Sequence, residues 1–117
     1  MAQPIEQFLE YMKNNYEWKH ECAKKCIDKP LYEYFDCLGY DSPERFILDT
    51  IDEIIDSTGH SKIYSALTWY DEMGKAGLVI VNPLGNKTSK TTEYEVKMGW
   101  KLREVIEDIY SIVEEMT

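Results

Sequence analysis

The chain has 117 residues, of which 44% are hydrophobic and 30% are charged, and its formal net charge at pH 7 is -9. This length is that of a single domain with one core, and the apolar content excludes an intrinsically disordered chain. The longest apolar runs fall well short of the roughly 20 residues that a membrane-spanning helix needs, so we expect a cytoplasmic protein with no membrane partner. The acidic balance disfavours nucleic-acid binding through the overall field, although it leaves room for a local basic patch.

The first predicted element is an amphipathic helix from about Pro4 to Ile27, because apolar residues recur there at spacings of mostly three to four. Pro30 ends this helix, and the aromatic stretch 31–39 is a short helical or irregular segment closed by Gly39. This first part of the chain also contains the three cysteines, Cys22, Cys26 and Cys37.

An odd number of cysteines in an apparently cytosolic chain indicates reduced thiols rather than a disulfide framework. A zinc site formed with His20 is the alternative, since zinc takes nitrogen and sulfur ligands. His20 and Cys22 are two residues apart, however, and would point to opposite sides of a helix. We therefore expect neither a metal nor another cofactor, and a redox-sensing thiol activated by Lys24 and Lys25 stays open.

The next segment begins with a helix-start pattern, in which Asp41 or Ser42 is the N-cap and Pro43 takes the first helical position. Gly59 supplies the stop of this helix. Its apolar stripe consists of Phe46, Ile47, Ile51, Ile54 and Ile55.

A further helix is predicted over about 61–75, with Ser61 as its cap and Gly77 as its end. Its apolar stripe consists of Ile63, Ala66, Leu67, Tyr70 and Met73. A β-hairpin follows at about 78–98, because Leu78–Val81 is rich in β-branched residues and the stretch around Tyr94 alternates apolar with polar residues. From Gly99 onward, an apolar stripe predicts a helix to the C-terminus.

This order predicts a mostly α chain with a small β-hairpin, in the α+β class, arranged as a winged helix-turn-helix with additional terminal helices. We expect one domain over 1–117. It comprises an N-terminal helical extension (1–40), the helix-turn-helix with its wing (41–99) and a C-terminal helix (100–117).

Two stretches also resemble a known family. "HSKIYSALTWYDEMGKAGLVIV" resembles the recognition-helix segment of MarR-like and PadR-like regulators, and "YEVKMGWKLREVIEDI" resembles the wing strand that leads into their final helix. The resemblance implies a DNA-binding transcriptional regulator of a prokaryote or its viruses, which is not an enzyme. It also implies a homodimer, in which two wings meet two half-sites of double-stranded DNA.

Polar residues of the expected recognition helix and wing are the candidate DNA contacts, because hydroxyl groups and lysines bind phosphates and base edges. They are Ser61, Lys62, Tyr64, Ser65, Thr68, Trp69, Asn86, Lys87, Ser89 and Lys90. The terminal helices offer more apolar face than a small winged helix needs, which predicts a dimer interface, with core packing inside one chain as the simpler alternative. The dimer candidates are Phe8, Leu9, Met12, Leu102, Val105, Ile106, Ile109 and Val113.

An acidic protein-interaction module on the same scaffold, acting as an inhibitor or nucleic-acid mimic, is the alternative function. Arginine, whose bidentate contact with guanine is the commonest specific contact, is missing from the recognition helix and the wing. The two functions differ in surface charge. Lysines converging on a face without carboxylates would favour DNA binding, whereas the intrusion of Asp71, Glu72, Glu93 or Glu95 would favour a protein partner. No catalytic constellation stands out from the sequence.

Overall fold

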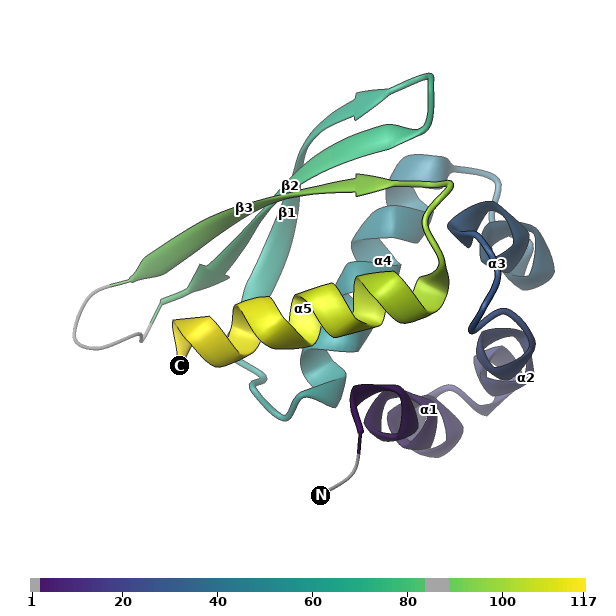
Figure 1. Cartoon of the computed structure of the whole chain (residues 1–117), viewed down its shortest axis with the longest axis horizontal. Coiled ribbons are helices and arrows are strands. Elements are labelled where there is room, and N and C mark those ends of the chain that lie inside the picture. The colour runs from purple at the N-terminus through teal and green to yellow at the C-terminus, as the bar shows by residue number, and fades with distance from the viewer. Residues whose placement is uncertain (1–2, 84–88) are drawn as a thin grey trace.

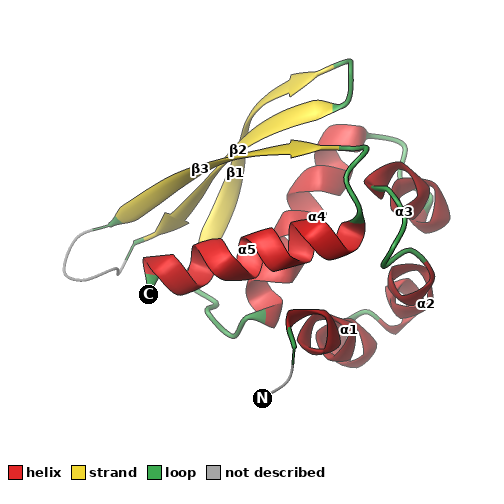
Figure 2. Ribbon diagram, in the orientation of Figure 1, coloured by secondary structure: helices red, strands yellow, loops and turns green. Residues whose placement is uncertain are grey.

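The computed structural model of the chain describes residues 3–83 and 89–117. Four helices come first: α1 (Pro4–Asn15), α2 (Glu17–Lys25), α3 (Leu31–Leu38) and α4 (Pro43–Ser57). Three strands follow, β1 (Tyr64–Asp71), β2 (Lys75–Asn82) and β3 (Lys90–Lys97), and α5 (Leu102–Met116) closes the described chain (Figures 1 and 2). The α+β class is confirmed.

The strands form an antiparallel sheet in the order β1-β2-β3. Its β2–β3 pair confirms the predicted hairpin, with Leu78 opposite Tyr94 and Ile80 opposite Thr92. Helices α4 and α5 cover one face of this sheet (Figure 1), so that Ile80 and Val96 are buried together with the apolar stripes of both helices. Among the described residues, no helix combines the length and the hydropathy that a bilayer crossing requires.

The predicted helix over 61–75 is wrong, because this segment forms β1 and the turn into β2. A bulge between Leu67 and Trp69 explains the misleading period. Ile63 and Leu67 point towards the helices, and the extra residue of the bulge brings Tyr70 back to the same side, three positions after Leu67. A bulged strand thereby imitates helical spacing, and no helix stands between α4 and the sheet where a recognition helix was expected.

The first predicted helix is also divided in two. Tyr16 leaves the helical region, with φ of -141° and ψ of 62°, and separates α1 from α2. The sequence before the break, Asn14-Asn15, has low helix propensity, and the Asn15 side chain bonds the carbonyl of Tyr11 instead of extending the helix. The break turns α2 away from the axis of α1 (Figure 1).

The end of β3 and the start of α5 are tied to the segment before α3. Leu31 N–H donates to the carbonyl of Trp100 at 2.9 Å, and Arg103 N–H donates to that of Ile27 at 2.8 Å. An isolated bridge joins Pro30 to Lys101. These bonds fix segment 27–32 on the body of the fold.

The residues expected to form a dimer interface are packed inside one chain. Leu9 is partly buried, and the others are between 0% and 2% exposed: Phe8, Met12, Leu102, Val105, Ile106, Ile109 and Val113. The apolar faces of α1 and α5 therefore pack against α4 and the sheet, as the core-packing alternative predicts, and the homodimer stays a prediction.

Candidate interaction surface and buried polar network

The face of the sheet opposite α4 and α5 is open to solvent. We call it the outer sheet face. Its side chains come from alternate positions of each strand: Tyr64, Ala66, Trp69 and Asp71 of β1, Lys75, Gly77, Val79 and Val81 of β2, and Thr91, Glu93, Glu95 and Lys97 of β3. Tyr64 and Trp69 are the large exposed side chains on it, at 50% and 45% exposure. An antiparallel sheet tolerates one solvated face, but that face is usually polar.

The indole ring of Trp69 contacts Gly77 on the neighbouring strand. A Cβ atom at position 77 would collide with the indole ring, so glycine is the residue that permits this contact. The strand bulge positions the ring, because it moves Trp69 into register with Gly77. Trp69 is thereby held in place while almost half of its surface is exposed, which is a property of aromatic anchors at interfaces.

Carboxylates lie directly beside this apolar strip. Glu93 is opposite Val79, Glu95 is opposite Gly77, and both side chains are exposed. Lysines occupy one end of the face, where Lys75 of β2 lies opposite Lys97 of β3 in the strand register. The outer sheet face therefore combines aromatic and aliphatic groups with acidic side chains, and carboxylates intrude where a DNA-binding face would exclude them.

The predicted DNA contacts do not form one surface. Tyr64 and Trp69 share the outer sheet face, whereas Ser65 points to the opposite side and donates its hydroxyl to Asp52 Oδ1 at 2.7 Å. Thr68 lies in the bulge and bonds the carbonyl of Gly77. Exposed positions outside the outer sheet face are Ser61, Lys62 and Ser89, while Lys90 is half-buried at the start of β3. Asn86 and Lys87 lie outside the described residues.

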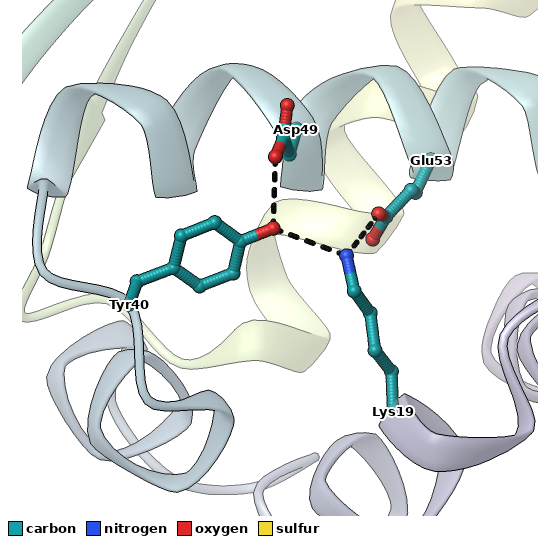
Figure 3. A network of polar contacts seen from close by, with 4 residues as sticks. All are labelled: Lys19, Tyr40, Asp49 and Glu53. Atoms are coloured by element: carbon teal, nitrogen blue, oxygen red, sulfur yellow. Dashed lines mark hydrogen bonds and ion pairs between the residues drawn. The ribbon is translucent and has the colours of Figure 1, made fainter.

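A second polar feature lies between α2 and α4 (Figure 3). Lys19 Nζ is 2.6 Å from Glu53 Oε2 and 3.0 Å from the Tyr40 hydroxyl, which in turn donates to Asp49 Oδ2 at 2.8 Å. The Lys19 and Glu53 side chains are 6% and 8% exposed. The rings of Tyr16, Trp18 and Tyr40 surround the ammonium group at 5.1 to 5.4 Å, within cation–π range.

The pKa shifts of this pair reflect burial and pairing. Burial raises the pKa of Glu53, and the hydrogen bond and charge of Lys19 oppose this shift. For Lys19 the signs are opposite. Burial, the largest single cause, lowers its pKa, but the hydrogen bonds to Glu53 and Tyr40 and the charge of Glu53 together outweigh burial, so that the pKa of Lys19 is raised. The 2.6 Å distance between Lys19 Nζ and Glu53 Oε2 is that of an ion pair. Lys19 was not among the predicted site residues. Its spacing of four residues from Ala23 and of seven from Cys26 places these three residues on one side of a helix, and this spacing is the sequence signal that could have identified it.

Around this pair, α4 presents a stripe of carboxylates, which we call the α4 acidic stripe: Asp49, Asp52, Glu53 and Asp56. It borders a pocket of about 250 Å³ together with Tyr16 and Lys19. Burial raises the pKa of Asp52, although its bonds to Ser65 oppose the shift. The pKa of Asp56 is raised as well. Partial burial is the main cause, and the charge of Asp52 adds to it. No group of three potential ligands is arranged to hold a metal ion within 3–83 and 89–117.

The cysteines depart from the expectation of reduced thiols. Cys22 of α2 and Cys37 of α3 form a disulfide, with their Cα atoms 5.7 Å apart, and Cys26 is a buried free thiol. The packing of α2 against α3 brings the two sulfurs together, and residue spacing alone does not contain that information.

Comparison of the chain with protein-family models, with curated proteins and with solved structures finds no match.

Proposed function

We propose that this protein is a non-enzymatic interaction module that binds another protein through the outer sheet face. The observation that carries the proposal is the exposure of Tyr64 and Trp69 next to the carboxylates of Glu93 and Glu95. Exposed aromatic groups supply apolar contact area at low entropic cost, and the acidic rim selects the partner by charge.

The chemistry of this face defines the partner. An apolar segment flanked by lysine or arginine would cover Tyr64 and Trp69 and place its cations beside Glu93 and Glu95. Within residues 3–83 and 89–117, neither glutamate side chain makes a hydrogen bond or an ion pair, so their charges are free to meet a partner. The net charge of -9 would further attract a basic protein over longer distances.

A displayed library of random peptides is the test. Peptides selected on the immobilised chain should contain lysine or arginine next to aromatic or aliphatic residues. Their affinity, measured by fluorescence polarisation, should fall about tenfold or more in the Glu93→Lys/Glu95→Lys variant, because the attraction becomes repulsion. Tyr64→Ser should also weaken binding, while the charge stays unchanged.

Glu114→Lys/Glu115→Lys is the matched control, since it makes the same charge change at exposed positions of α5. An equal loss of affinity in both double variants would show that net charge alone causes the loss, and it would contradict the proposal. Binding of the chain to a DNA duplex of random sequence is measured in a second experiment. Binding at low salt that falls steeply as salt rises would favour the DNA-binding regulator instead.

A further inference from the structure

Helix α2 is weakly anchored by apolar contacts. Of its nine residues, Lys19 and Ala23 are buried, and the buried Cys26 caps its C-terminus. An isolated helix of this length is unstable in water, so tertiary contacts have to hold it. The two strongest such contacts are the ion pair of Lys19 with Glu53 and the disulfide of Cys22 with Cys37.

The disulfide is accessible from solvent. Cys37 is an exposed residue and Cys22 is half-buried, so the bond lies at the surface of the protein. Exposed disulfides are the ones that thiol–disulfide exchange opens readily. In a reducing compartment, this bond would form and break with the redox state of the surroundings.

The partner element of the disulfide is anchored independently. Leu31 N–H donates to Trp100 O, Tyr32 N–H donates to Met98 O at 3.2 Å, and Leu31 and Tyr34 are buried. The Tyr34 ring also packs edge-on against Phe46 of α4. Loss of the disulfide therefore leaves α3 in place. Of the two contacts named above, the ion pair of Lys19 with Glu53 is then the one that still holds α2, which lies between α1 and segment 27–32.

The α4 acidic stripe lies against α2. Lys19 is the cation that α2 contributes there, one turn before Cys22 on the same helix. We infer that the Cys22–Cys37 disulfide is a redox latch that holds α2 over the α4 acidic stripe, and that its reduction unfolds α2 locally and exposes these carboxylates. This inference is independent of the outer sheet face.

A dithiol reductant performs the step. Its thiolate attacks Cys37 Sγ, forming a mixed disulfide and breaking the bond to Cys22, which leaves as a thiolate and takes a proton. The second thiol of the reductant then closes its own disulfide and releases Cys37. Two electrons and two protons pass from the dithiol to the chain, and Cys26 takes no part.

The free thiol of Cys26 reports on the latch. It is 3% exposed, and in a Cys22→Ser/Cys37→Ser variant it stays the one titratable thiol, as it is in the oxidised chain. We expect its reaction with a chromogenic aromatic disulfide reagent to be at least about tenfold faster in the variant, because local opening of α2 uncovers it. Acylation of Lys19, read by mass spectrometry against the exposed Lys24, should rise in parallel in the variant and in the chain reduced with dithiothreitol.

Hydrogen exchange separates local release from general unfolding. The inference requires faster exchange in 17–26, with α5 and the sheet unchanged. Equal reactivity of Cys26 and Lys19 with and without the disulfide would overturn the inference. Faster exchange throughout the chain would also overturn it, because the disulfide would then stabilise the whole fold rather than α2 alone. Cys26→Ser, which keeps the disulfide, should leave Lys19 as unreactive as in the oxidised wild-type chain.

Discussion

At the scale of single residues, the buried lysine is the least expected feature of this chain. Lysine and glutamate are rarely fully buried unless they are paired, and here Lys19 and Glu53 satisfy each other across α2 and α4. Tyr40 extends the pairing to Asp49, so four side chains from three parts of the chain share one set of bonds (Figure 3). A partner removed from such a network leaves a buried charge behind.

We predict that Lys19→Met lowers the free energy of unfolding by about 3–5 kcal/mol, because Glu53 keeps its buried charge without a counter-ion. Urea denaturation of the oxidised chain measures this cost. The double variant Lys19→Met/Glu53→Leu should recover most of the loss, since no charge is left uncompensated. A single-variant cost below about 1 kcal/mol would show that the pair contributes no more than an exposed ion pair.

At the scale of elements, the start of α4 and the ends of α3 and α4 followed their sequence patterns, and strand β1 did not. The Ser42 side chain accepts from Arg45 N–H at 3.3 Å, Pro43 opens α4, and Gly39 and Gly59 follow their helices with positive φ, all as predicted. These patterns depend on neighbouring residues, which the sequence gives directly. Ser61 carries the same hydroxyl group, but it lies in a turn before a strand, so no helix begins there for it to cap.

The two serines therefore provide a matched pair. Ser42→Ala should lower the free energy of unfolding by about 1 kcal/mol, because the first turn of α4 loses its capping acceptor. Ser61→Ala should change it by less than about 0.5 kcal/mol, as an exposed substitution without such a contact. Thermal unfolding followed by circular dichroism compares them. Comparable losses in both variants would contradict the assigned difference between a capped helix and a turn.

At the scale of the whole molecule, the excess of acidic groups governs the dependence on pH. Burial raises the pKa of Asp52 and Glu53 in the folded chain, and the pKa of Asp56 is raised as well. A carboxyl group with a raised pKa favours the folded state below its unfolded pKa, near about 4, and loses that contribution as pH rises through its folded pKa. Asp28 acts in the opposite direction, because its bond to Arg103 lowers its pKa.

We therefore expect the free energy of unfolding to decrease as pH rises from about 4 through the raised folded pKa values of these groups. It should decrease again as pH falls below about 4, where Asp28 is protonated. Asp56→Asn should flatten the upper slope, since it removes one of the three raised carboxyl groups. Glu115→Gln, which neutralises an exposed charge of α5, is the control for net charge. Urea denaturation across this range measures both, and a stability that rises steadily to pH 7 would contradict the assignment.

Local sequence patterns were sufficient to predict the α+β class, the β2–β3 hairpin, and the approximate extents of α4 and α5. Local chemistry decides these features: caps, glycine stops, β-branched runs and uninterrupted apolar periods. It also supplied the residues Tyr64 and Trp69, although as part of a helix.

The tertiary structure decided the rest. Whether Ile63, Leu67 and Tyr70 follow a helix or a bulged strand depends on β2, which offers β1 a hydrogen-bonding edge and a glycine for Trp69 to cover. The apolar stripes of α1 and α5 indicated burial, but only the packing showed that the same chain buries them. The Lys19–Glu53 pair and the Cys22–Cys37 disulfide join residues 34 and 15 positions apart, and such contacts follow from how helices pack rather than from any local pattern.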